Sequence, residues 1–216
     1  NSSSKFLFKY LDAPSPHIEY SGITISPILV FLNGRCCFTD SDNPSKSISL
    51  ALETPPPIDI TAGSIKLTIF PIPIETHNVF HEDVEINKEQ DFELILECAG
   101  KPTVYKDEET YNKDTGTTMN FESVIPVGLF SASQNEGFVQ TPHIILNGRV
   151  VKTYGNSTQF GFDESDVLYS LSCLGNEYDV VMHSEFSDNV RIEEGNIVSC
   201  VYRVQGWPNQ NDYSDK

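Results

Sequence analysis

The sequence predicts a mostly β fold, an antiparallel sandwich or a partly open barrel with little helix. Apolar and polar residues alternate with a period of two, which is typical of strands with one buried face. In residues 47–53, for example, one face of a strand would carry Ile48, Leu50 and Leu52, and the other would carry Ser47, Ser49 and Glu53. Turn-forming Pro, Gly and Asn residues interrupt these runs at short intervals, a pattern that all-β sandwiches and barrels share. A chain of 216 residues fits one domain or two tightly fused halves.

The expected elements follow from these patterns in chain order. Strands are predicted at residues 28–32, 47–53, 64–69, 92–97, 144–146 and 197–204. Two short helices are expected, at 82–90 and 107–113. We interpret the chain as one compact unit with an N-terminal β half (1–104), a polar connection (105–120), a barrel-like C-terminal β half (121–207) and a frayed tail (208–216).

Two Asn-Gly pairs, Asn33-Gly34 and Asn147-Gly148, each follow an apolar run and precede an arginine. Asn-Gly between apolar runs is the strongest short-range signal of a two-residue hairpin turn, because both turn positions need positive φ. The sequence therefore predicts a hairpin at each pair. The repeat is explained either by two corresponding β halves or by chance recurrence of a common turn.

The charge is strongly negative, with 31 Asp and Glu against 14 Lys and Arg, a formal net charge of −17. Such a field repels nucleic acids and anionic lipid surfaces and favours encounter with basic partners. No apolar run is long enough to cross a membrane as a helix. We therefore expect a soluble protein that does not bind nucleic acid or insert into membranes and whose partner is a protein, while an acidic surface that serves solubility alone is the alternative.

The five cysteines are Cys36, Cys37, Cys98, Cys173 and Cys200. An odd number without a C-x-x-C pair fits a reducing compartment, so the expected location is the cytoplasm. We interpret all five as small core residues. Cys36 and Cys37 would point to opposite faces of a strand and could not easily pair with each other.

The strongest metal candidates are His77 and His81, followed at once by Glu82. Histidines four residues apart share one face of a helix, as zinc ligands do. However, Asn78 stands where a catalytic zinc motif needs Glu, so an ordinary solvated loop is the competing interpretation. The sequence contains no nucleophile elbow, phosphate-binding loop or dinucleotide fingerprint, and we expect no cofactor.

Two groups of residues are candidates for binding. Tyr154, Tyr202 and Trp207 are aromatic residues of the kinds that protein interfaces favour, although core packing is the usual fate of buried tyrosines. Asp107, Glu108 and Glu109 form an acidic run in the polar connection.

The C-terminal half, residues 147–206, is similar to a β module of uncharacterised bacterial proteins. The resemblance rests on Asn147-Gly148-Arg149-Val150, on residues 156–160, on Leu174 to Val181 with its Asp179-Val180-Val181, and on the glycine-led strand that begins at Gly195. It implies a small, partly open barrel, and no activity comes with it.

In form alone, the chain also resembles the protruding spike domain of astrovirus-type capsids, because it is β-rich, lacks an initial Met and ends in a polar tail. That resemblance implies a role in host attachment at the virion surface. The function expected from the residues themselves is non-enzymatic binding of a protein with a basic surface. The alternatives are such a capsid spike and a metal-dependent hydrolase that uses His77 and His81.

Overall fold

The computed structural model describes residues 18–20, 23–31, 35–40, 72–73, 75–76, 89–116, 121–127 and 141–208. Before residue 91, and at residues 207 and 208, the description is of the backbone alone, apart from the burial of Cys36.

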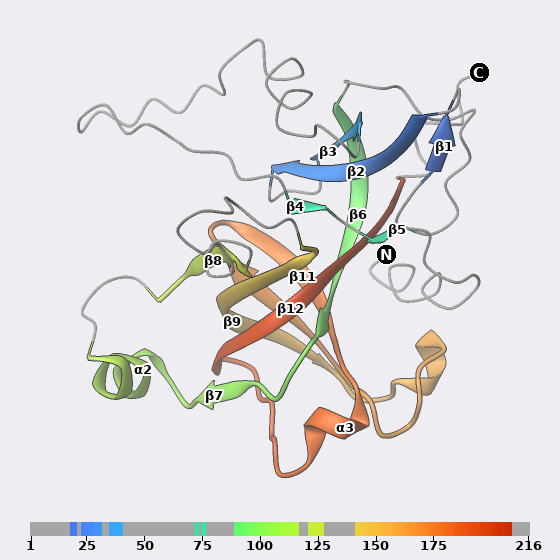
Figure 1. The fold of residues 1–216 in the computed structure, drawn as a ribbon. Helices are drawn as coiled ribbons and strands as arrows, with labels where there is room; N and C mark the ends of the chain where they lie inside the picture. Colours follow the sequence, from blue (N-terminus) through green and yellow to red (C-terminus); the bar gives the residue numbers. More distant parts are fainter. Residues whose placement is uncertain are drawn as a thin grey trace.

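Five strands close into a barrel (Figure 1): β6 (Glu89–Cys98), β9 (His143–Tyr154), β10 (Val167–Cys173), β11 (Asn176–Met182) and β12 (Ile197–Pro208). Around the barrel the order is β6, β11, β10, β9, β12 and back to β6. Every contact in this ring is antiparallel except that between β11 and β6, which is parallel. The prediction of a mostly β fold is confirmed, and the barrel is a mixed one.

Further strands extend this barrel. β7 (Thr103–Tyr105) pairs with β12, and β8 (Ser123–Pro126) pairs with β9. Towards the N-terminus, β5 (Glu75–Thr76) runs parallel to the end of β12. These additions lengthen the sheet at both ends of the barrel.

The earliest strands form an antiparallel set joined to the barrel through β6. They are β1 (Ile18–Tyr20), β2 (Ile23–Phe31), β3 (Arg35–Asp40) and β4 (Ile72–Pro73). β2 pairs with β1, β3 and β4, and β3 pairs with β6. In Figure 1 this set lies at one end of the barrel, and β7 lies at the other end.

Helix is scarce in the described part of the chain. α2 (Glu108–Thr115) confirms the helix expected at 107–113. α3 (Ser184–Ser187) and the 3-10 helix η3 (Thr158–Phe160) are single turns. The helix expected at 82–90 is wrong at its end, because residues 89 and 90 already begin β6, and its earlier residues lie outside the described ones. No helix in the described ranges is long and apolar enough to cross a membrane.

The barrel interior is filled by alternate residues of all five strands. Leu94, Leu96 and Cys98 point inward from β6, and Val198, Cys200, Tyr202 and Val204 do so from β12. This alternation leaves odd-numbered residues of β6 and β12 on the outer face. There, Phe160 and Phe162 of the β9–β10 connection cover Ile95, Leu168 and Val181. The interpretation of the cysteines as core residues is confirmed for Cys36, Cys98, Cys173 and Cys200, which are buried.

The two Asn-Gly pairs have different structures. Asn33-Gly34 lies between β2 and β3, which form an antiparallel pair up to Phe31 and Arg35; the turn itself is outside the described residues. The hairpin predicted at Asn147-Gly148 is wrong, because both residues lie inside β9, which continues to Tyr154, and Gly148 is not among the positive-φ residues. The proposed correspondence between the two halves fails with it.

Gly148 is required for close packing of strands. A Cβ built on Gly148 would lie 2.8 Å from the backbone oxygen of Ser172 on β10. At this point β9 changes partners, since it pairs with β12 up to Arg149 and with β10 from Arg149 onward. A glycine inside a strand commonly marks such a close backbone approach.

Candidate functional site

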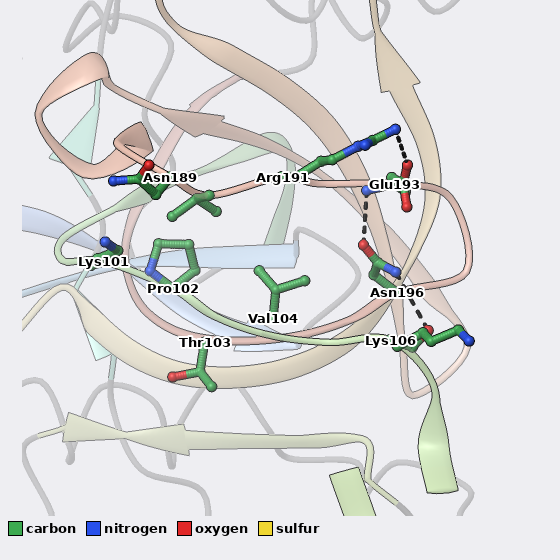
Figure 2. Close-up of a pocket in the computed structure, with 10 residues that line it drawn as sticks. Lys101, Pro102, Thr103, Val104, Lys106, Asn189, Arg191, Glu193 and Asn196 are labelled. Atoms are coloured by element: carbon green, nitrogen blue, oxygen red, sulfur yellow. Dashed lines mark hydrogen bonds and ion pairs between the residues drawn. The ribbon is translucent and has the colours of Figure 1, made fainter. Parts of the chain in front are cut away.

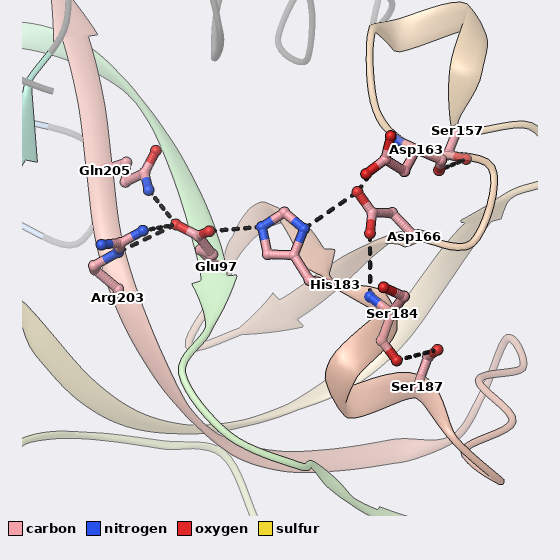
Figure 3. A network of polar contacts seen from close by, with 9 residues as sticks. All are labelled: Glu97, Ser157, Asp163, Asp166, His183, Ser184, Ser187, Arg203 and Gln205. Atoms are coloured by element: carbon pink, nitrogen blue, oxygen red, sulfur yellow. Dashed lines mark hydrogen bonds and ion pairs between the residues drawn. The ribbon is translucent and has the colours of Figure 1, made fainter. Parts of the chain in front are cut away.

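The most elaborate polar site among the described residues is centred on Glu97, on the outer face of β6. Its side chain is only 10% exposed. One carboxylate oxygen, Oε2, accepts hydrogen bonds from Arg203 Nε at 3.1 Å, from Arg203 Nη2 at 2.5 Å and from Gln205 Nε2. The other, Oε1, lies 2.6 Å from His183 Nε2. Figure 3 shows these side chains converging on Glu97.

The pairing of β6 with β12 brings these residues together. Leu96 lies opposite Val204 in the antiparallel register, so the outward-pointing Glu97 is next to Arg203 and Gln205, which both occupy the outer face of β12. His183 follows β11 directly and is the N-cap of α3. Because β11 is parallel to β6 at Val181 and Glu97, the residues just after β11 reach the same position.

His183 lies between two carboxylates. Its Nδ1 is 3.2 Å from Asp166 Oδ2, while Nε2 faces Glu97. A neutral imidazole can donate only one of these hydrogen bonds, whereas an imidazolium donates both. The geometry therefore suits a charged His183, which with Arg203 balances the charges of Glu97 and Asp166.

Asp166 fixes the loop that covers this face. Its Oδ1 accepts the backbone N–H of Ser184 at 3.1 Å, and its Oδ2 accepts that of Asp163 at 3.3 Å. The same loop is closed by Ser157 Oγ, which donates to the backbone oxygen of Asp163 at 2.5 Å. The network thus joins the β9–β10 connection to β6, β12 and the start of α3.

The chemistry open to this network is limited because its atoms are already engaged. Both ring nitrogens of His183 face carboxylates, and both oxygens of Glu97 accept hydrogen bonds. A general base needs a free lone pair within reach of a substrate proton, and His183 offers none in this arrangement. Within this network one buried side-chain atom, Gln205 Oε1, has no hydrogen-bond partner.

A second polar cluster lies on the outer face of β10 and β11. Ser170 Oγ donates to Asp179 Oδ1 at 2.6 Å, and Tyr154 OH donates to the same oxygen at 3.1 Å. Burial raises the pKa of Tyr154 above its ordinary value. Its ring also packs edge-on against Phe160, with the centroids 5.5 Å apart. Tyr154, predicted as an interface residue, is thus hydrogen-bonded within a polar cluster, and its side chain is only partly accessible to solvent.

The other aromatic candidates lie in different environments. Tyr202 is in the barrel interior with 0% of its surface exposed, and its hydroxyl is 3.4 Å from that of Tyr169. Burial raises the pKa of both tyrosines well above the ordinary value. Tyr202 is therefore not part of an exposed surface. Trp207 pairs with Glu93 through the backbone of β12, and its side chain is outside the described residues.

The acidic candidates lie at the start of α2. Asp107 is the N-cap, and its Oδ1 accepts the backbone N–H of Thr110 at 2.8 Å. Glu108 and Glu109 follow in the exposed first turn. Arg149 Nη2 lies 3.4 Å from Glu108 Oε2, and its Nη1 donates to the backbone oxygen of Gly195 at 3.3 Å.

The metal candidates His77, His81 and Glu82 lie outside the described residues. Within the described ranges, no group of three or more His, Cys, Asp or Glu side chains is arranged to hold a metal ion. The Glu97 network does not change this, since its carboxylate oxygens are already in contact with His183 and Arg203.

No protein-family model, curated protein or solved structure matches the chain.

Proposed function

We propose that this chain is a non-enzymatic binding protein that recognises a protein partner with a basic surface. The observation that carries the proposal is that two acidic segments are held side by side. Arg149 contacts Glu108 at the start of α2 and Gly195 in the turn before β12. Glu193 and Glu194 belong to that turn. We call Glu108, Glu109, Glu193 and Glu194 the acidic corner.

The acidic corner has a fixed framework. Asn196 Nδ2 donates to the backbone oxygen of Lys106 at 3.4 Å, and the backbone N–H of Glu193 donates to Asn196 Oδ1 at 2.9 Å. β7 also pairs with β12 between Tyr105 and Ile197. Because the backbone is tied on both sides, a partner would meet carboxylates that extend from an already ordered backbone, which lowers the entropic cost of binding.

The charges at this corner remain accessible to a partner. The side chains of Glu108 and Glu193 are 49% and 54% exposed, and their cation partners Arg149 and Arg191 are themselves at the surface. Exposed pairs of this kind are weak, contributing about 0–1 kcal/mol, so a basic partner can compete for these carboxylates. The net charge of −17 over the whole chain would speed the encounter with such a partner.

Binding is favoured over catalysis by the state of the Glu97 network. Its histidine and carboxylates are engaged with one another and with the loop that covers them. Such an arrangement stabilises a surface and leaves no group free to transfer protons.

The proposal is tested with a fluorescein-labelled decapeptide of alternating Lys and Ser, whose affinity is measured by fluorescence anisotropy at low salt. The variant combines Glu109→Gln, Glu193→Gln and Glu194→Gln. Because each lost charge contributes up to about 1 kcal/mol to a surface interaction at low salt, we expect binding about tenfold or more weaker.

The matched control combines Glu164→Gln, Glu177→Gln and Glu185→Gln, three exposed carboxylates elsewhere on the described surface. Its net charge equals that of the corner variant. We expect the control to lose less than threefold in affinity. Equal losses in the two variants would show that only the net charge matters and would overturn the acidic corner as the binding site.

A further inference from the structure

An open groove of about 680 Å³ lies between β7 and the segment that leads from α3 to β12. Its apolar lining is Pro102, Val104 and Val190, and its charged lining includes Lys101, Lys106 and Arg191. Figure 2 shows the chain from Lys101 to Lys106 on one side and the chain from Asn189 to Glu193 on the other. The volume lies within the range of about 300–1,000 Å³ that is typical of ligand sites.

β7 offers a free strand edge to this groove. It pairs with β12 through Thr103 and Ser199, Val104 and Val198, and Tyr105 and Ile197. Among the strands that the structure describes, β12 is its only partner. A strand with one unpaired edge is a template to which an extended segment can add.

The groove is locally cationic in a strongly acidic protein. Lys101 Nζ donates to the backbone oxygen of Asp188 at 2.9 Å, which leaves its charge without a carboxylate partner. In the described part of the chain, neither Lys101 nor Lys106 has a carboxylate within 4.0 Å, whereas Arg191 pairs with Glu193 at 2.7 Å. Two cations are thus available to an anionic ligand.

We propose that this groove binds an extended acidic segment of a protein partner. The segment would add along the free edge of β7 by backbone hydrogen bonds, with apolar side chains on Val104 and Val190. Its carboxylates would pair with Lys101 and Lys106. These two lysines are five residues apart in sequence, so an extended backbone places their Cα atoms at most about 17 Å from each other. A long polyanion such as a nucleic acid is disfavoured, because it would extend over the surrounding acidic surface.

This groove and the acidic corner take ligands of opposite charge, although Glu193 borders both. The inference does not depend on the proposed function. A partner that presents a basic patch beside an acidic strand would contact both surfaces at once. A partner with a basic patch alone would contact only the acidic corner.

The test uses a fluorescein-labelled decapeptide of alternating Glu and Val, with affinity measured by fluorescence anisotropy. Lys101→Gln and Lys106→Gln together are expected to weaken binding at least tenfold. The matched control is the double variant Lys113→Gln and Lys152→Gln, which removes two exposed charges outside the groove and is expected to change affinity less than twofold. If the parent protein does not bind this peptide, or if the control loses as much as the groove variant, the groove is not the site.

Strand addition is tested separately with the same peptide methylated at every backbone nitrogen, so that neither edge of the peptide keeps its donors. Methylation leaves the charges in place and removes backbone donors, so we expect at least a tenfold loss of affinity. Unchanged binding of the methylated peptide would overturn the proposal, because it would mean that charge alone holds the ligand. The acidic-corner variant should bind the Glu-Val peptide at least as tightly as the parent, because Glu193→Gln releases Arg191 from its carboxylate partner, while it loses affinity for the Lys-Ser peptide, so the two proposals fail independently.

Discussion

Replacing Gly148 with alanine should destabilise the barrel through a single contact. The added Cβ would lie 2.8 Å from the backbone oxygen of Ser172, whereas ordinary contact begins at 3.4 Å, so the overlap is about 0.6 Å. Leu146 Cδ2 at 3.3 Å and Cys173 Cβ at 3.5 Å close off other directions. The obstructing atom belongs to the backbone of a paired strand and cannot rotate away, so β9 and β10 would have to separate locally.

The expected loss is about 1–3 kcal/mol, the usual cost of overpacking a close-packed site. For a protein of this size, each kcal/mol lowers the melting temperature by about 2–4 °C. Urea unfolding followed by circular dichroism gives the free energy, and thermal unfolding gives the temperature.

Gly155→Ala is the matched control, because a Cβ at Gly155 meets nothing within 4 Å. Its stability should stay within about 0.5 kcal/mol of the parent. If Gly148→Ala is as stable as Gly155→Ala, the close approach of β9 and β10 does not exist in solution, and the role assigned to Gly148 is wrong.

Three further predictions concern the buried charges, the helix cap and the thiols. Glu97→Gln should cost about 1–3 kcal/mol in urea unfolding because it removes the charged acceptor of the hydrogen bonds from Arg203, while Glu93→Gln on the same face should cost little; equal effects would contradict the network. The two hydrogen bonds from Thr110 lower the pKa of Asp107 below its ordinary value of 3.8, so its stabilising effect is complete above pH 3.8 and is lost as the pH falls through the lowered pKa. Accordingly, the difference in melting temperature between the parent and Asp107→Ala should be constant above pH 3.8 and shrink below it, and a carboxyl titration by NMR with a midpoint at or above 3.8 would refute this. Burial raises the pKa of the Cys173 thiol to about 12, so mass spectrometry should find Cys173 unmodified by iodoacetamide at pH 9 until urea unfolds the chain.

Local pattern was sufficient to predict β6, whereas the strands predicted at 47–53 and 64–69 lie outside the described residues. Phe92, Leu94 and Leu96 alternate with glutamates, and they lie on the inner face of β6. The short helix after Asp107 was also predictable, since the N-cap and the acidic first turn are local signals. These features depend on residues that are neighbours in sequence, so periodicity and capping preferences reveal them.

The strand that contains Gly148 was not predictable from its local pattern. Asn147-Gly148 has the composition of a hairpin turn, but Leu146 and Val150 are both buried in the barrel. The free energy of burying both of them in one continuous strand outweighs the local turn preference. Asn147 finds partners there as well, because its Nδ2 donates to Ser123 Oγ at 2.9 Å and to Tyr111 OH at 3.2 Å.

The Glu97 network could not have been found by motif. Its charged members, Glu97, Asp166, His183 and Arg203, come from four separate parts of the chain and meet only through the closure of the barrel. Sequence spacing carries no signal for such a site. A glutamate on the outer face of an alternating strand is usually solvated, but here His183, Arg203 and Gln205 surround the carboxylate.

The closure of the barrel has a consequence for how it forms. β6 enters and β12 leaves the barrel side by side, with Phe92 opposite Pro208, so the first and last strands of the ring must find each other across the whole intervening sequence. Contacts of such high sequence separation are slow to form, because the entropy of closing the long loop is lost before the contact is gained. Because the end of β12 lies beside the start of β6, a short linker could join these two strands directly. The new chain terminus could then be placed between β10 and β11, at the turn around Gly175. Such a circular permutant would retain every strand pair of the ring and make the contact between β12 and β6 a local one, while the pair of β10 and β11 would become the contact of highest sequence separation.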